Sequence, residues 1–150
     1  MTEVTRSRQV AADPAMVWEV LGHFGAISQW APNVDHSCLM SDQTEGVGTV
    51  RRIQTGRTTL VERVTEWEPG STLAYTIEGL PALVRSVVNR WTLDASNRGT
   101  LISLSSEIDT GPRPPQRLVA RVVGRKLATE SEKMLDGLDR HLSERGSAIQ

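Results

Sequence analysis

The sequence predicts one α+β domain, over residues 1–150, in which a seven-stranded antiparallel sheet packs against a long C-terminal helix. Three observations lead to this prediction. Seven short runs rich in β-branched and aromatic residues alternate with turns that contain glycine or proline. Two short helical segments follow the first run. Residues 115–145 then carry apolar side chains mostly at intervals of three and four, which is the period of a helix.

The first elements are a strand over residues 5–11 and two short helices. Asp13 and Pro14 occupy the positions of an N-cap and of a first helical residue. Apolar side chains follow at helical spacing, and Pro32 ends the second helix because proline cannot continue it. The side chains that define these two helices are Val17, Trp18, Val20, Leu21, Phe24, Ile27 and Trp30.

Six further strands follow, and short turns separate them. Residues 34–40 and 48–55 are expected to form a hairpin, and we expect the sheet to be antiparallel. Gly56, Gly70 and Gly79 are among the turn residues. The expected strands are residues 34–40, 48–55, 58–67, 72–78, 85–94 and 100–109.

The final segment, residues 115–145, is expected to form one helix with an apolar stripe. A helix of this kind buries its stripe against another element, and the sheet is the partner available. The stripe comprises Leu118, Val119, Val122, Val123, Leu127, Met134, Leu135, Leu138 and Leu142.

Residues 10–32 carry a motif that resembles the polyketide cyclase/dehydratase and lipid-transport branch of the START-like (SRPBCC, Bet v 1-like) superfamily. The matching residues are Pro14, Val17, Trp18, Phe24, Gly25, Trp30 and Pro32. The resemblance extends over nearly the whole chain and implies a helix-grip fold, in which a curved sheet and the long helix enclose a cavity. It implies little about activity, because this fold hosts carriers, cyclases, receptors and regulators.

Strand alternation predicts which side chains line that cavity. For residues 58–67 we favour Arg63 and Trp67 as inward; the alternative points Leu60, Glu62 and Val64 inward and places a carboxylate inside. His36 and Cys38 are expected to face inward on their strand. The expected ligand-contacting residues are Trp30, His36, Arg63, Trp67, Tyr75, Asn89, Trp91, Ile102, Leu104, Ser106, Leu118 and Val122.

Three of these residues, Arg63, His36 and Tyr75, are candidates for catalysis. The resemblance implies a role for Arg63, because an arginine in a similar sequence setting guides substrate oxygens in aromatase/cyclase relatives. The alternative is that Arg63 faces water or pairs with a neighbouring strand. The tyrosine that such relatives carry shortly after the tryptophan matched by Trp30 is absent here. No metal-ligand spacing, P-loop or GxGxxG motif is present, so we expect neither a metal nor a cofactor.

Four arginines recur at every fourth residue near the start of the last helix, namely Arg113, Arg117, Arg121 and Arg125, with Lys126 adjacent. This stripe is either a solvated helix face or a surface for an anion, such as a lipid headgroup, a phosphorylated ligand or an acidic partner.

Composition narrows the classes of partner. The 17 basic and 18 acidic side chains balance, so no overall field favours nucleic acid. No apolar run reaches the length of a membrane span, so we expect no stable membrane insertion. The single cysteine and the absence of a signal-peptide pattern at the start lead us to expect a cytoplasmic protein. We expect the protein to be a monomer or a homodimer.

The leading functional hypothesis is a carrier or binding module for a hydrophobic small molecule, namely a lipid, a polyketide or another aromatic metabolite. The main alternative is an aromatase/cyclase- or dehydratase-like enzyme. A regulator that uses the basic stripe to meet a partner is a third hypothesis. A cyclase requires at least two acid–base groups facing one site, whereas a carrier requires only a closed apolar cavity.

Overall fold

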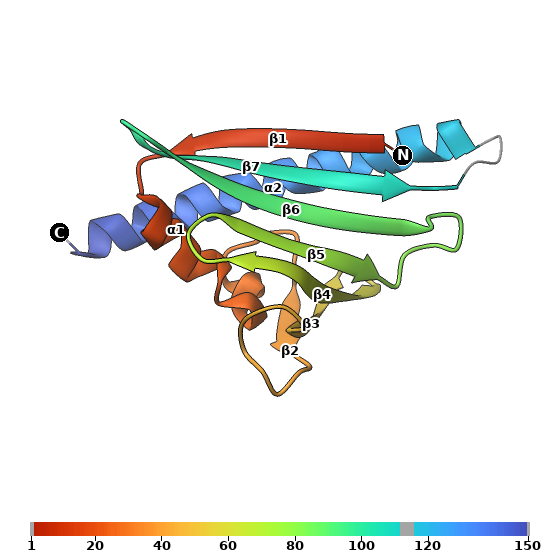
Figure 1. Ribbon diagram of the computed structural model, residues 1–150, viewed down its shortest axis with the longest axis horizontal. Coiled ribbons are helices and arrows are strands. Elements are labelled where there is room, and N and C mark those ends of the chain that lie inside the picture. The colour runs from red at the N-terminus through yellow and green to blue at the C-terminus, as the bar shows by residue number, and fades with distance from the viewer. Residues whose placement is uncertain (1, 112–115, 150) are drawn as a thin grey trace.

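The elements of the computed structural model, which describes residues 2–111 and 116–149, follow the predicted order. Two helical segments separate the first strand from the rest of the sheet, and one long helix ends the chain (Figure 1). The elements are β1 (Thr2–Val10), α1 (Pro14–Leu21), the 3-10 helix η1 (Phe24–Gln29), β2 (His36–Leu39), β3 (Val50–Thr55), β4 (Thr58–Glu68), β5 (Thr72–Glu78), β6 (Ser86–Ser96), β7 (Gly99–Asp109) and α2 (Gln116–Ile149).

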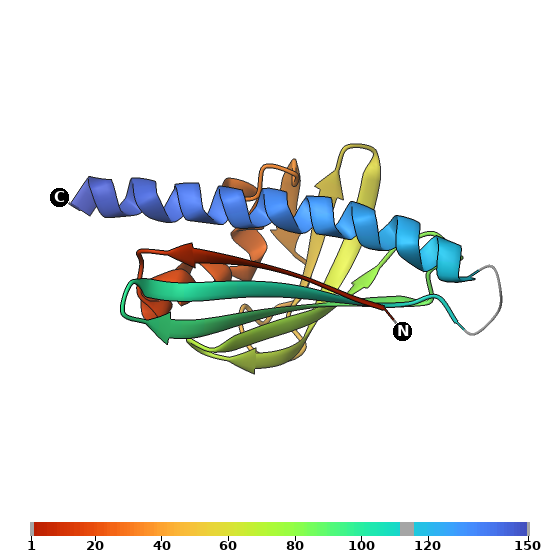
Figure 2. The same ribbon diagram turned by 90° about the horizontal axis from the view of Figure 1, so that it is seen from above.

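The seven strands form one sheet in the order β1-β7-β6-β5-β4-β3-β2, and every neighbouring pair is antiparallel. The long β6 and β7 pair along their whole length, and β1 lies beside β7. The sheet curves, and α2 runs along it past β1 and β7 (Figure 2). This arrangement confirms the predicted α+β helix-grip fold.

The N-terminal helices form as the sequence indicates. The Asp13 carboxylate accepts a hydrogen bond from the Met16 amide at 2.9 Å, which caps α1, and Pro14 occupies its first turn. Val17, Leu21 and Phe24 are buried, so α1 and η1 contribute to the same core as the sheet.

A β-bulge in β4 divides that strand into two parts with opposite facing. The register against β5 shifts between Val64 and Glu66, so one extra residue is inserted there. Before the bulge, Glu62 and Val64 are buried and Arg63 is half exposed beside Glu78. The preference for Arg63 as inward is therefore wrong, and the alternative with Glu62 inside applies.

The inward position of Trp67, which lies beyond the bulge, agrees with the prediction. Its ring packs against Trp18 of α1 with ring centroids 5.1 Å apart. One unbroken alternation cannot place both Glu62 and Trp67 on the inner face, because the two residues are five positions apart, which is an odd number.

The predicted facing of β2 is also wrong, because His36 and Cys38 are exposed. Ser37 and Leu39 face inward instead. The Ser37 hydroxyl donates to the Gly25 carbonyl at 2.8 Å and joins β2 to η1. The predicted strand begins at Val34, but in the structure Val34 lies in a turn that precedes the strand.

The long helix α2 continues past the predicted end at residue 145, while the predicted start, Pro115, lies outside the described residues. Its C-terminal half buries large aliphatic side chains, whereas its N-terminal half buries small ones. Leu118 and Val122, which we expected on the buried stripe, are exposed. The buried residues of α2 are Ala120, Gly124, Ala128, Ser131, Met134, Leu135, Gly137, Leu138 and Leu142.

Candidate functional site

A string of polar side chains crosses the buried, concave face of the sheet, from β3 to β7. It comprises one residue from each strand in turn: Arg51, Glu62, Tyr75, Asn89 and Ser106, all at most 3% exposed. Register explains their closeness. Arg51 is directly opposite Glu62, and Asn89 lies between Tyr75 and Ser106.

Arg51 and Glu62 form a buried ion pair at one end of this string. The Nε and Nη2 atoms of Arg51 both lie 2.8 Å from Glu62 Oε1. Nη1 donates to the Phe24 carbonyl at 2.9 Å, and the guanidinium lies 3.8 Å above the Phe24 ring and 4.7 Å from the Tyr75 ring. Two aromatic rings, a carboxylate and a carbonyl therefore surround the charge, which offsets its desolvation.

Burial raises the pKa of the Glu62 carboxyl above its ordinary value of 4.5, and the charge and hydrogen bonds of Arg51 oppose that rise. The carboxyl therefore holds a proton more strongly than an exposed glutamate does. A group of this kind can act as a buried acid if a ligand reaches it.

Tyr75 occupies the middle of the string and accepts hydrogen bonds from two neighbours. The Trp91 Nε1 group donates to its hydroxyl oxygen at 3.2 Å, and Asn89 Nδ2 does so at 3.5 Å. The Ser106 hydroxyl in turn donates to Asn89 Oδ1 at 2.6 Å. The orientation of the Asn89 amide is thereby fixed by its two partners.

Burial, followed by the negative charge of Glu62, raises the pKa of the Tyr75 hydroxyl, so the group stays protonated at neutral pH. Its proton has no acceptor in the hydrogen bonds of the described residues, where the oxygen only accepts. Tyr75 thus offers a donor directed from an otherwise apolar wall.

Aromatic rings form that wall. Phe24 packs edge to face on Tyr75 with ring centroids 5.6 Å apart, and Trp30 packs in the same way on Trp91 at 5.9 Å. Ile102 and Leu104 of β7 are fully buried beside them. The wall combines planar surfaces with few polar points, which is typical of sites for hydrophobic small molecules.

The structure brings together eight of the twelve expected ligand-contacting residues on or beside this face. They are Trp30, Trp67, Tyr75, Asn89, Trp91, Ile102, Leu104 and Ser106. Their contact with a ligand remains a prediction. The other four lie elsewhere: Arg63 and His36 are on the exposed side of their strands, and Leu118 and Val122 are on the outer face of α2.

Sequence reasoning did not select Arg51 and Phe24, and it placed Glu62 only in the alternative facing of its strand. The sequence signal that could have identified Arg51 and Glu62 is cross-strand pairing. An arginine and a glutamate that face each other across the turn at Gly56 are an opposite-charge cross-strand pair once the register is set by that turn.

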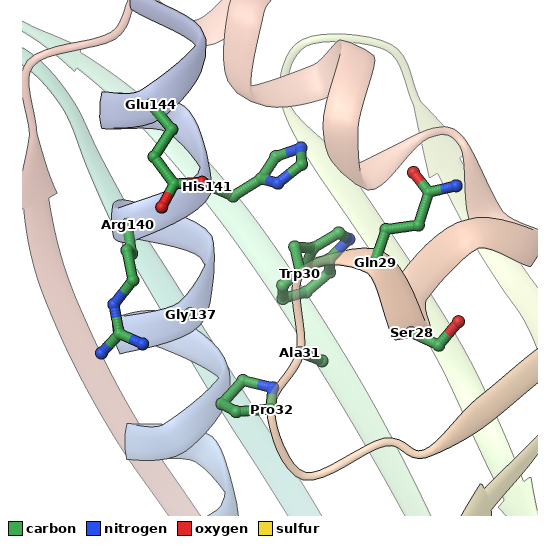
Figure 3. Close-up of a pocket in the computed structure, with 9 residues that line it drawn as sticks. All are labelled: Ser28, Gln29, Trp30, Ala31, Pro32, Gly137, Arg140, His141 and Glu144. Carbon is green, nitrogen blue, oxygen red and sulfur yellow. The ribbon is translucent and has the colours of Figure 1, made fainter. Parts of the chain in front are cut away.

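Two pockets lie along the C-terminal half of α2. One, of about 220 Å³, is bordered by Trp30 and Pro32 on one side and by Arg140, His141 and Glu144 of α2 on the other (Figure 3). Gly137 forms part of its floor, where a Cβ atom would overlap the Trp30 carbonyl. The second, of about 290 Å³, lies between the end of β1 and Leu142. Neither pocket reaches Arg51, Glu62 or Tyr75.

Within residues 2–111 and 116–149, no group of three or more His, Cys, Asp or Glu side chains is placed to hold a metal ion. In the same residues, no helix is long and apolar enough to cross a membrane.

Comparison with known proteins gives one family match. The family model described as polyketide cyclase/dehydrase and lipid transport matches residues 1–143. No curated protein sequence matches the chain.

Solved structures with the same fold include an aromatase/cyclase. The Zhui aromatase/cyclase from Streptomyces sp. R1128 is 18% identical, with 96% of this chain and 94% of that chain covered and a TM-score of 0.79. Ara h 8.0201 is 16% identical, with 95% and 98% covered and a TM-score of 0.73. A protein from Thermobifida fusca is 25% identical, with 96% and 95% covered and a TM-score of 0.76.

Proposed function

Because the chain belongs to the polyketide cyclase/dehydrase and lipid-transport family, we propose that it binds one hydrophobic small molecule between the sheet and α2 without turnover. The ligand is a lipid, a polyketide or another aromatic metabolite that carries at least one polar oxygen. This proposal takes residues 1–150 as one domain, located in the cytoplasm as a monomer or homodimer.

The observation that carries the proposal is the Tyr75 hydroxyl. It lies buried among Phe24 and Trp91, its oxygen accepts two hydrogen bonds, and its proton has no acceptor among the described residues. A buried donor without an acceptor is costly, and a ligand carbonyl or hydroxyl oxygen would remove that cost. Aromatic rings on either side supply the apolar contact that a hydrophobic ligand requires.

Entry of a ligand to Tyr75 requires the helix and sheet to separate, because Tyr75 is 1% exposed and neither of the two described pockets reaches it. The N-terminal half of α2 is the part suited to move. Its buried residues are the small Ala120, Gly124 and Ala128, and its larger apolar residues at the core, Val123 and Leu127, are only partly buried. The C-terminal half is fixed more firmly, because Arg8 of β1 pairs with both Asp136 and Asp139.

The second candidate function is an aromatase/cyclase- or dehydratase-like enzyme. Two neighbouring titratable groups with raised pKa values, Glu62 and Tyr75, favour it, since such clusters are frequent at active sites. In that case Arg51 would hold an enolate oxygen, and Glu62 and Tyr75 would exchange protons with the substrate. Arg63 and His36 have no part in this version, because both are on the exposed side of the sheet.

The experiment first identifies compounds that co-purify with the native protein by mass spectrometry, and then titrates the protein with an anilinonaphthalene sulfonate probe while following tryptophan fluorescence. Trp91→Ala should weaken probe binding, because part of the aromatic wall is removed. Arg63→Ala, on the outer side of β4, should leave it unchanged and serves as the control. Tyr75→Phe keeps the ring but removes the oxygen that accepts from Trp91 and Asn89, so the thermal midpoint should fall. Measured well below that midpoint, binding of the co-purified compound should weaken about fivefold.

The Glu62→Gln variant should distinguish the two candidate functions. A carrier should retain its affinity for the co-purified compound within a small factor. An enzyme should lose cyclisation or dehydration of a polyketide while still binding it. Absence of any bound compound, together with equal probe binding by wild type and Trp91→Ala, would refute both candidates. For the assembly state, light scattering on a sizing column tests the monomer or homodimer.

A further inference from the structure

The two halves of α2 differ in how their charges are balanced. Residues 130–145 carry three basic and five acidic side chains, several of which are paired, as in Lys133 with Glu130 and Arg140 with Asp136. Residues 116–129 carry four basic side chains and no carboxylate. None of these four forms an ion pair with any residue that the structure describes, whereas residues of the C-terminal half do.

The unpaired cations surround two exposed aliphatic side chains. Leu118 is 62% exposed and Val122 is 58% exposed, although both are of a size that is usually buried. Their spacing of four places them on one ridge of the helix, and Arg121, Arg125 and Lys126 are three or four residues from one or both. We name these five residues (Leu118, Arg121, Val122, Arg125 and Lys126) the outer patch.

The outer patch points away from the sheet. The buried side of this half of α2 is formed by Ala120, Gly124 and Ala128 with the partly buried Val123 and Leu127, and Gly124 lies close to Val4 of β1. At 100° per residue, Val122 is about 160° from both Ala120 and Gly124 around the helix. Figure 2 shows α2 on one side of β1 and β7, so the opposite side of this helix is not covered by the sheet.

Charge distinguishes the outer patch from the exposed apolar side chains in the connection between β2 and β3. Met40 and Val47, in the connection between β2 and β3, are exposed to a similar degree, at 58% and 60%. That connection contains Asp42 and Glu45 and no basic residue. Of these two sites, therefore, only the outer patch combines exposed apolar side chains with positive charge.

We propose that the outer patch docks the protein on the surface of an anionic phospholipid bilayer. A bilayer surface offers both chemistries that the patch requires: negative headgroups for Arg121, Arg125 and Lys126, and an acyl boundary for Leu118 and Val122. An acidic protein would satisfy the cations but has no need of the aliphatic pair. The contact is peripheral and involves no spanning helix. It does not depend on the proposed ligand, so the two proposals can be tested separately.

The test is cosedimentation of the intact protein with phosphatidylcholine vesicles, with and without phosphatidylserine. Each cation close to an anionic surface strengthens binding about fivefold, so Arg121→Gln/Arg125→Gln/Lys126→Gln should weaken binding on the order of 100-fold. Leu118→Ser/Val122→Ser should weaken it about tenfold, which corresponds to roughly 60 Å² of apolar surface that no longer enters the acyl boundary. Salt should weaken the wild-type interaction.

Two control variants match these changes in number and type. Arg52→Gln/Arg57→Gln/Arg98→Gln removes three exposed arginines elsewhere, and Met40→Ser/Val47→Ser removes the other exposed aliphatic pair. Both controls should bind as the wild type does. All substituted positions are exposed. Circular dichroism checks that each variant is folded. The single variant Arg121→Gln, for which we expect about a fivefold loss of vesicle binding, replaces any multiple variant that is not folded.

Three results would overturn the proposal. The first is absence of binding to anionic vesicles, or equal binding to neutral ones. The second is an equal loss of binding in the control variants. The third is unchanged binding by Leu118→Ser/Val122→Ser together with weaker binding by the variant that removes the three cations, which would show that only electrostatic attraction holds the protein to the vesicles and that the aliphatic pair does not enter the acyl boundary.

Discussion

The buried pair of Arg51 and Glu62 gives the sharpest test of the structure, because breaking it and replacing it should have different consequences. Arg51→Met removes the guanidinium and leaves the Glu62 carboxylate only 3% exposed, without its counter-charge. Glu62→Leu leaves the arginine in the same position. Each single change should lower the free energy of unfolding by about 3–5 kcal/mol at neutral pH.

The double variant Arg51→Met/Glu62→Leu should be far less damaging than either single change. It places no charge in the core and keeps similar side-chain volume. The Phe24 carbonyl loses its donor and the ring loses the stacked cation, so we expect a residual cost of about 1–2 kcal/mol. Urea unfolding of the four proteins, followed by tryptophan fluorescence, gives the double-mutant cycle directly.

The pH dependence of Arg51→Met adds a second readout with a definite sign. The pKa of Glu62 is raised in the folded protein, and loss of Arg51 removes a cause that lowers it. A group whose folded pKa lies above its unfolded value contributes stability that is fully present below the unfolded pKa and is lost as pH rises through the folded pKa. The penalty of Arg51→Met should therefore be smaller at about pH 5 than at about pH 8. A penalty independent of pH, or a double variant as unstable as the sum of the singles, would refute an ionised pair in the core.

Two further predictions concern packing and capping. Gly137→Ala should lower the free energy of unfolding by about 1–3 kcal/mol, because its Cβ would overlap the Trp30 carbonyl. Gly146→Ala, in the same helix with no atom near the added Cβ, should instead be neutral or stabilising by up to about 1 kcal/mol, and thermal unfolding compares the two. Asp13→Ala should cost about 1 kcal/mol by the same measurement, since the Met16 amide loses its cap; a loss in Asp13→Asn as large as in Asp13→Ala would contradict this reason.

The order of elements could be predicted from the sequence because each boundary has a local cause. Asp13 and Pro14 start α1, and the turns between strands contain glycines with positive φ, such as Gly56 and Gly70. On strands β5, β6 and β7, simple alternation correctly placed Tyr75, Asn89 and Ser106 inside. These strands pair without a register shift, so one inward–outward alternation applies along the whole length of each strand.

The predictions that the structure contradicts share a physical origin, which is local irregularity that residue patterns do not reveal. The bulge after Val64 reverses the facing of β4, so that Glu62 and Trp67 are both inside and Arg63 is outside. On β2, the predicted strand begins at Val34, which in the structure is buried in a turn before the strand. The resemblance to aromatase/cyclases drew attention to Arg63, whereas the arginine inside this protein is Arg51, on the neighbouring strand.

The face of α2 was misassigned for a related reason: apolar periodicity gives weight to large side chains, whereas close contact between a helix and a sheet favours small ones. Ala120, Gly124 and Ala128 let the N-terminal half of α2 approach β1 and β7, and this contact turns Leu118 and Val122 toward solvent. Because small residues bury little apolar area, the packing between the sheet and this half of the helix is weaker than in the C-terminal half. The same geometry leaves apolar side chains on the outer side of the helix, where they can contact another surface. If that surface is a bilayer, the part of α2 that must move to admit a hydrophobic ligand is the part that meets the membrane, so a ligand could enter without crossing water.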